Sequence, residues 1–438
     1  MGCTAEPGEG GGYSTATLLN VKTSAHGRHY DPDARAPMTS LPTMPSSLVD
    51  FEVQNLTQAR FVQLLHAACR QGSRVDSSDT SSSSSTTTTT TSSSSSSVFF
   101  TALPQSFTQQ HLSPTRPLFL TSDDHKLHRQ FAWVSTGGSV THTHFDQDYN
   151  VFVQLVGSKR FTLFAPSQAR FLAPFSRLHP LWHKSKANFA RPALDIIPEY
   201  AHARAVTVDV HAGDVLYIPP YVWHRVETLS PVSLSLSTLS HDDATRGAMD
   251  AIYRMDHKFD RLRHHQGRVF ALRVYIDLLV HDMVGNHPDE VRRFASDLVD
   301  RRYRGLTQYF PRRSSSNGTS VCQARVPNKI PTAHHVFGDC NTDKALVVSH
   351  FAELRPEIRD FLFEEYIEDL VQEVVGVARV LDFFHDCFQG QGYYLTHIGD
   401  EEHELWDYKS DAEDEGEGED EGEDEGEEES ENEPMHET

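Results

Sequence analysis

The chain has 438 residues, of which 38% are hydrophobic, and its formal net charge is −23. Seventeen Asp or Glu and no Lys or Arg lie in residues 411–438, so the other residues carry only −23 + 17 = −6, which argues against a polybasic nucleic-acid binder. No stretch is apolar enough to span a membrane, and five scattered cysteines exclude a disulfide framework and indicate a reducing intracellular compartment, the cytoplasm or the nucleus.

The N-terminal part of the chain alternates between low-complexity and patterned segments. Residues 1–45 are rich in Gly, Pro and Thr without periodicity, and we expect them to be mostly disordered. Within Thr57–Arg70, apolar residues recur at helical spacing. Residues 77–97 are almost purely Ser and Thr and cannot bury a core, so we interpret them as a disordered insert inside one domain that spans residues 46–240.

Short β-type runs dominate the chain from residue 98 to about residue 240. Gly, Pro and Asp turns separate these runs, and many short strands of this kind predict a mainly β core, either a sandwich or a jelly-roll barrel. In Val232–Thr238 serines alternate strictly with apolar residues, so we expect the apolar face to be core and the serine face to line something polar. The predicted strands are Phe131–Ser135, Val151–Val156, Arg160–Phe164, Ala205–Val210, Val215–Ile218 and Val232–Thr238.

Beyond residue 240 the pattern becomes helical, and residues 241–400 are interpreted as a helical region. The predicted helices are Ala244–Arg263, Arg268–Val284, Asp289–Tyr303 and residues 346–389. A loop is expected at residues 310–345. This region either covers the barrel or serves homodimerisation or substrate docking. The sequence does not distinguish these roles, because amphipathic helices have the same apolar pattern in each of them. Residues 401–438 are expected to form a disordered acidic tail.

Three residues form a candidate metal site. Residues two apart on a strand point to the same face, so His144 and Asp146 can reach one metal ion. His224 would supply a third ligand from the end of a strand–turn–strand unit. Two histidines and a carboxylate that leave coordination positions open are typical of non-haem Fe(II) oxygenases. Since the chain has 26 histidines, one His-x-Asp is nearly expected by chance, and the context has to support it.

Polar residues near the candidate ligands supply that context. Lys159 follows the turn Val156-Gly157-Ser158, and a lysine directed into a barrel needs an anion. Asn150 and Thr141 offer further polar contacts beside the metal. Together these features favour a binding pocket for an anionic co-substrate over a purely structural site.

Two segments carry a family resemblance. Trp133–Pro166 resembles the core of JmjC-domain hydroxylases, in pattern closest to the group that contains the asparaginyl hydroxylase of hypoxia-inducible factor. Val208–Glu227, with a Gly-Asp turn followed by Pro-Pro, Trp and His, resembles the second signature of that family. The resemblance covers about residues 98–240 and implies a double-stranded β-helix, the cupin-type jelly roll.

The resemblance also implies roles for individual residues. The three candidate ligands would bind Fe(II), with 2-oxoglutarate and O2 as co-substrates. Lys159 and Thr141 would bind the distal carboxylate of 2-oxoglutarate, and Asn150 would lie near its metal-binding end. Ser237 stands where several relatives have Asn, and would make the same contact with a shorter reach. His142, a position that is often Pro in relatives, is expected to support the site or to be solvated.

The leading functional hypothesis is a dioxygenase that hydroxylates a side chain of a partner protein and releases succinate and CO2. A methyl-lysine demethylase would use the same iron centre, but the chain has no Cys-rich chromatin reader and no basic patch. A tRNA hydroxylase is disfavoured by the acidity of the folded part. A barrel that keeps a metal without catalysis is the non-enzymatic alternative.

Overall fold

The computed structural model describes most of the chain between residues 128 and 389. The described residues are 128–187, 194, 197–285, 290–304, 321–322 and 330–389, with the shorter segments 18–24, 52–57 and 97–102 and parts of 60–70. The prediction of disorder for the tail at 401–438 lies outside these residues, and so does that for the insert at 77–97 except at Ser97, which belongs to a strand. None of the helices in this part of the chain is both long and apolar enough to cross a lipid bilayer.

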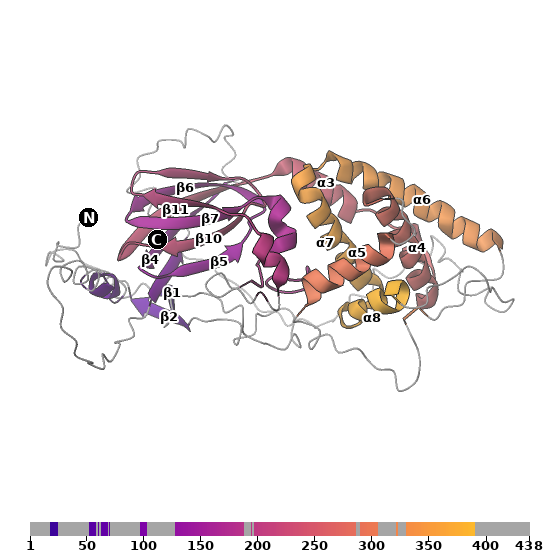
Figure 1. Ribbon diagram of the computed structural model, residues 1–438, viewed down its shortest axis with the longest axis horizontal. Helices are drawn as coiled ribbons and strands as arrows, with labels where there is room; N and C mark the ends of the chain where they lie inside the picture. Colours follow the sequence, from indigo (N-terminus) through magenta and orange to yellow (C-terminus); the bar gives the residue numbers. More distant parts are fainter. Residues whose placement is uncertain are drawn as a thin grey trace, which may run out of the picture.

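Two antiparallel sheets form the β part of the molecule (Figure 1). The larger sheet has the strand order β2-β1-β3-β4-β11-β6-β9. Its strands are β1 Leu18–Ser24, β2 Glu52–Thr57, β3 Ser97–Ala102, β4 His128–Thr136, β6 Asp148–Val156, β9 Val215–Ile218 and β11 Val232–His241. The smaller sheet has the order β5-β10-β7-β8. Its strands are β5 Val140–His144, β7 Ser158–Phe164, β8 Val206–His211 and β10 Trp223–Thr228. The predicted cupin-type β core is confirmed.

The inner faces of the central strands carry many polar side chains. On β11 the three serines Ser233, Ser235 and Ser237 are buried, whereas the intervening apolar residues are only partly buried. The serine face therefore lines the barrel interior as predicted, but the apolar face is not the main core. A small apolar cluster of Phe152, Phe161, Val210 and Ile218 occupies the interior instead.

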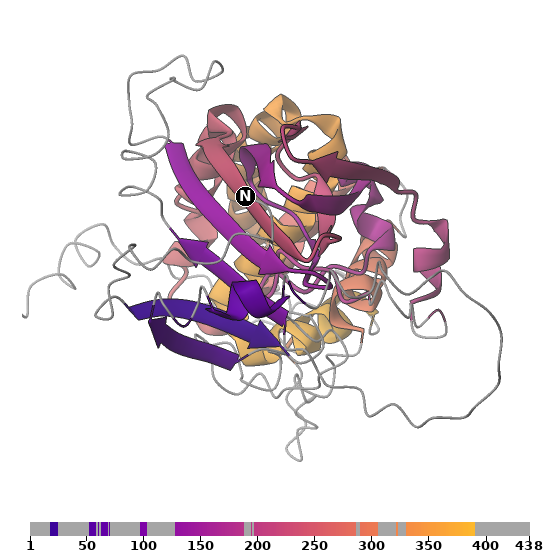
Figure 2. The ribbon, with the colours of Figure 1, turned by 90° about the vertical axis from the view of Figure 1, so that its left-hand side faces the viewer.

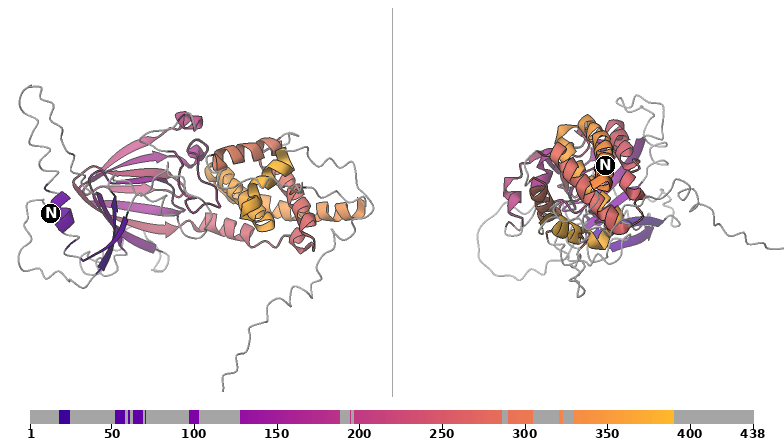
Figure 3. Two further views of the ribbon diagram at one scale, coloured as in Figure 1. Left: turned by 90° about the horizontal axis from the view of Figure 1, so that it is seen from below. Right: turned by 90° about the vertical axis from the view of Figure 1, so that its right-hand side faces the viewer.

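The helices gather at one end of the barrel, as the side and end-on views show (Figures 1, 2 and 3). They are α3 Asp243–Tyr253, α4 His265–Met283, α5 Glu290–Leu298, α6 Ile330–Glu353, α7 Pro356–Val375 and α8 Val380–Phe384. Shorter turns are η2 Pro166–Phe171, η3 Pro198–His202, η4 Lys258–Arg261, η5 Val299–Tyr303, η6 Val377–Arg379 and η7 His385–Gln389. One hydrophobic cluster runs from the barrel residues Phe145 and Trp223 into α4 and α7, so the helices pack onto the barrel.

Several local predictions were wrong. A strand, β1, lies within residues 1–45, which we expected to be mostly disordered, and it pairs with β2 and β3. The predicted helix Ala244–Arg263 ends at Tyr253, because the chain then turns into the short η4 helix. The expected loop at 310–345 is helical from Ile330 onward. These differences reflect strand pairing and helix packing, which local sequence patterns do not contain.

The cysteine interpretation also needs correction. A disulfide joins Cys322 to Cys387 across a sequence separation of 65 residues, while Cys340 is buried outside any disulfide and donates to the Ala271 carbonyl at 3.8 Å. The spacing of the cysteines in the sequence did not predict this disulfide, because only the tertiary fold brings the two cysteines together.

Candidate metal centre and co-substrate pocket

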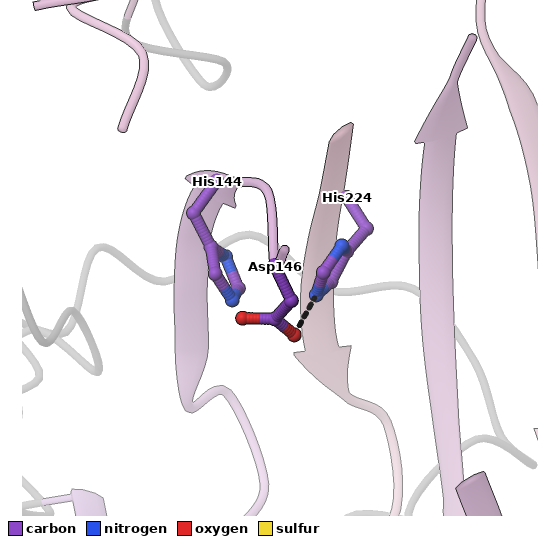
Figure 4. A group of neighbouring side chains, drawn as sticks. All are labelled: His144, Asp146 and His224. Carbon is purple, nitrogen blue, oxygen red and sulfur yellow. Dashed lines mark ion pairs between the residues drawn. The ribbon is translucent and has the colours of Figure 1, made fainter. Parts of the chain in front are cut away.

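His144, Asp146 and His224 lie together in one group of side chains (Figure 4). One potential ligand atom from each lies within 4.8 Å of the others, and no other group of three such residues is found in the part of the chain that the structure describes. His144 ends β5 and lies opposite His224 at the start of β10 in the antiparallel register. The His224 Nε2 atom is 3.7 Å from the Asp146 Oδ2 atom.

Both imidazoles are held with the same nitrogen toward the ligand position. His144 Nδ1 lies 2.8 Å from the carbonyl oxygen of His142, and His224 Nδ1 lies 3.0 Å from that of Val222. A carbonyl only accepts hydrogen bonds, so each Nδ1 is the protonated nitrogen and each Nε2 keeps its lone pair for a metal. Burial, with the nearby His224 and Lys184, lowers the pKa of His144 well below its usual value, which keeps its ring neutral.

Asp146 reaches the site from a loop and not from a strand. Strand β5 ends at His144, so the predicted same-face geometry of a strand does not place this carboxylate. Its position is set by the backbone: the Tyr221 N–H donates to the Asp146 carbonyl at 2.7 Å. Tyr221 adopts a positive φ of 64°, a conformation that is costly for a bulky residue and that clusters at functional sites.

A cavity of about 400 Å³ opens beside the three candidate ligands. The four residues predicted to contact the co-substrate all line it, namely Thr141, Asn150, Lys159 and Ser237. A larger cavity of about 720 Å³ lies elsewhere, between η2, α5 and α7. Because that cavity contains none of the candidate metal ligands, size alone does not identify the functional site.

Lys159 is a buried cation without an anionic partner in the described residues. Its side chain, on β7, is only 4% exposed. Its Nζ atom donates to Ser235 Oγ at 3.0 Å and lies 5.5 Å from the centre of the Phe152 ring, and no ion pair involves it. Burial lowers the pKa of Lys159 to about 7. A site that keeps an unpaired amine buried is suited to an entering carboxylate.

Two more cavity residues are arranged to contact a ligand. The buried Asn150 Oδ1 atom has no hydrogen-bond partner among the described residues. Ser237 Oγ accepts a hydrogen bond from Trp133 Nε1 at 3.0 Å, so its own hydrogen is available for donation. A polarised hydroxyl and a buried amine, both able to donate to a carboxylate, therefore share one cavity with the three candidate metal ligands. The residues present fit an iron ion with a dicarboxylate co-substrate.

Neighbouring residues refine the sequence interpretation. His142 is buried and not solvated: its Nε2 atom lies 3.1 Å from the Ser185 carbonyl oxygen and its own carbonyl orients His144. Tyr221 and Trp223 are buried against Phe145, which favours packing over a role at the substrate entrance.

Trp182 and His183 are among the lining residues that the sequence interpretation did not identify. Their segment has no periodic pattern or motif that would have identified them. Burial and then the neighbouring Lys184 lower the pKa of His183 to about 4, so its imidazole is neutral where it lines the pocket.

Comparison with known proteins agrees with this geometry. A family profile described as a cupin-like domain matches residues 21–238. A JmjC domain-containing protein of Dictyostelium discoideum, protein D, is 32% identical over 99 residues, which are 23% of this chain and 22% of that protein. Residues 21–238 thus match a cupin-like domain, and part of this domain is similar to JmjC domain-containing proteins.

Two further JmjC relatives match over similar lengths. HSPB1-associated protein 1 of Mus musculus is 35% identical over 130 residues, 28% of this chain and 26% of that protein. Lysine-specific demethylase JMJ30 of Arabidopsis thaliana is 35% identical over 111 residues, 24% of each chain. The chain thus matches about a quarter of the length of these relatives, which is the length of a shared domain and not of a whole protein.

Proposed function

We propose that this JmjC protein is an Fe(II)- and 2-oxoglutarate-dependent dioxygenase that hydroxylates a side chain of a protein substrate. The observation that carries the proposal is that one cavity joins a site of two histidines and a carboxylate to the buried, unpaired amine of Lys159. A structural metal would not need an anion pocket beside it. Members of this family typically are oxygenases, which is consistent with the same interpretation.

The chain's own residues have separable tasks in this proposal. His144, Asp146 and His224 would hold the metal at the wall of the cavity, where the co-substrate would also bind. Lys159 pairs with the distal carboxylate of 2-oxoglutarate, and Thr141 donates a hydrogen bond to it. When bound, iron and 2-oxoglutarate supply O2 activation and the oxidation of a substrate C–H bond.

The remaining cavity residues orient the co-substrate and limit water. Asn150 contacts the end of 2-oxoglutarate nearest the metal, and Ser237 donates its hydroxyl hydrogen to the co-substrate. Apolar rings of Phe152 and Phe161 border the same cavity and reduce the room for water. No acid–base pair of side chains is assigned, because the oxidation does not require one.

The test is an anaerobic titration of the purified protein with Fe(II) and then 2-oxoglutarate, followed by the visible charge-transfer band of the chelated metal. We expect a band in the wild type that is absent from His224→Ala and strongly reduced in Lys159→Ala. Metal binding without any band would favour the non-catalytic alternative, a cupin barrel that keeps its metal as a structural element.

A methyl-lysine demethylase is the second candidate, because lysine-specific demethylase JMJ30 is among the relatives that match this domain. Both reactions would use the same metal and co-substrate residues. Mass spectrometry of candidate peptides separates them: hydroxylation adds one oxygen atom to an unmodified peptide, whereas demethylation removes methyl groups from a methylated one. Loss of methyl groups alone would contradict the hydroxylase proposal.

A further inference from the structure

Phe145 lies between two candidate ligands in the chain, and its ring is enclosed by four other aromatic rings. Its side chain is 1% exposed. The ring centres of Trp182, Tyr221 and Trp223 lie 5.4, 5.5 and 4.8 Å from that of Phe145. The fourth ring is Phe361 of α7, which meets Phe145 edge to face at 5.3 Å and 87°. Three of the rings come from the β domain and one comes from the helical region.

Phe361 contacts the chain neighbours of all three candidate ligands. Phe145 separates His144 from Asp146, and Trp223 directly precedes His224. The Phe361 ring also packs edge-on against Trp223, with ring centres 6.0 Å apart. A single helical side chain therefore supports both backbone segments that carry the ligands.

Phe361 is itself held on its other side by a buried ion-pair network. The Arg302 guanidinium lies 4.7 Å from the centre of the Phe361 ring, and its Nη2 atom donates to the Phe361 carbonyl at 3.1 Å. Arg302 is fully buried and pairs with Glu364 and Glu368, each at 3.0 Å. Glu368 also accepts from the hydroxyl of Ser176, which belongs to the β side of the molecule, at 2.6 Å.

The Phe361 ring contacts both a cation anchored by two carboxylates and the ring of Phe145, and it also lines the cavity of about 720 Å³. Interiors are close-packed, so a shift of Phe361 would be transmitted to the Phe145 backbone and to the ligands on either side of it. Metal sites depend on ligand positions held to about 0.5 Å, which such packing can supply.

We propose that Phe361 is a positioning residue of the metal centre, through which the helical region fixes the distances among His144, Asp146 and His224. The inference rests on the proposed function only in assuming that these three residues bind a divalent metal. It assigns the helical region a task at the metal site in addition to covering one end of the barrel.

The test compares Phe361→Leu with a matched control on the same helix, Phe363→Leu. Phe363 is also buried, with 2% of its side chain exposed against 8% for Phe361, but it packs against Phe294 and Phe351, with ring centres 5.4 and 5.5 Å away, and makes no ring contact with Phe145. Both variants lose a similar part of one buried ring, so their thermal stabilities should fall by similar amounts. A merely structural role would therefore affect both variants alike.

The deciding measurement is Co(II) binding to the metal-free proteins, followed by the visible d–d spectrum and by competition with a chelator. We expect Phe361→Leu to weaken Co(II) binding by about 10- to 100-fold, the range typical for residues that orient metal ligands. Phe363→Leu should bind Co(II) as the wild type does. Phe361→Met, which keeps more of the volume, should weaken binding in the same direction if the leucine variant does not fold.

The outcomes separate the two proposals. Equal Co(II) affinity in Phe361→Leu, Phe363→Leu and the wild type would overturn the positioning role and leave the proposed function intact. Equal losses in both leucine variants would show a general packing effect and would likewise overturn it. A wild type that binds no Co(II) would refute the metal site, and the positioning role with it.

Discussion

Replacement of Lys159 by methionine should stabilise the metal-free protein while it removes the co-substrate site. The amine is 4% exposed, and within the described residues it has one hydrogen bond and no ion pair. An apolar side chain of similar length would fit the same space without the cost of burying a charge. If the function of Lys159 is to bind an anion, its buried charge destabilises the ligand-free protein, and the bound anion offsets this destabilisation.

The magnitude follows from the pKa of Lys159. Burial lowers this pKa from 10.5 to about 7. At about 1.36 kcal/mol per pKa unit, burial disfavours the charged form by close to 5 kcal/mol. The methionine variant forfeits the hydrogen bond to Ser235, which costs about 1–3 kcal/mol. We therefore expect the free energy of unfolding of the metal-free variant to rise by about 2–4 kcal/mol at neutral pH.

The sign of the pH dependence is defined as well. The folded-state pKa of Lys159 lies below the unfolded value, so the charge penalty is fully present below about pH 7 and disappears as the pH rises toward 10.5. The stabilisation by Lys159→Met should accordingly be largest below pH 7 and shrink in alkaline solution.

Lys186 is the matched control. Burial lowers its pKa to about 7 as well, but its Nζ atom donates to the carbonyl oxygens of Arg301, Arg302 and Arg304 at 2.8, 2.8 and 3.2 Å. Lys186→Met would leave those carbonyls without their donor, so we expect a loss of about 2–3 kcal/mol. Two buried lysines with similar pKa values should thus respond in opposite directions.

Urea unfolding of the metal-free proteins measures the stability change, and calorimetry with Mn(II) and 2-oxoglutarate measures the loss of co-substrate binding. The reasoning would be refuted if Lys159→Met destabilised the protein as Lys186→Met does. It would also fail if the variant still bound 2-oxoglutarate with wild-type affinity.

Three more predictions follow from other buried groups. Calorimetry should show that 2-oxoglutarate binds about 50-fold more weakly at about pH 9 than at about pH 7, because Lys159 must be protonated to pair with a carboxylate. In oxidising buffer, Cys322→Ser should lower the free energy of unfolding by about 4 kcal/mol, since the bond to Cys387 closes a loop of 65 residues, and a thiol reductant should abolish the difference from wild type. Arg302→Met leaves Glu368 buried without its cation, and urea unfolding should show a loss of about 3–5 kcal/mol.

The site was predictable from the sequence because its signals are local. His144 and Asp146 are two residues apart, and Lys159 follows the turn Val156-Gly157-Ser158 on β7. Alternation in Val232–Thr238 predicted a serine face that lines a polar space, and Ser237 lines the cavity together with Lys159. The reason given for Asp146 was nevertheless wrong, since a loop braced by the Tyr221 N–H places it, and not a strand.

What the sequence could not indicate depends on contacts between distant segments. Phe361 looks like any apolar residue of an amphipathic helix, and only the fold places it against Phe145. The pairing of Cys322 with Cys387 and the membership of β1 in the large sheet are of the same kind. A helix from Ile330 was missed because Pro331 and Gly338 indicate a loop, although Pro is tolerated in a first helical turn.

The distribution of apolar residues indicates that the barrel depends on the helical region for its stability. The barrel interior contains only a small apolar cluster, including Phe152 and Phe161, because serines and other polar side chains occupy the positions that a stable core would use. Polar interiors suit a ligand but contribute little to stability. The large cluster instead runs from Phe145 and Trp223 through α4 and α7. This large cluster supplies the stability that the polar barrel interior lacks, and it includes the residues beside the candidate metal ligands. The stability of the protein and the positions of the ligands therefore depend on the same contacts.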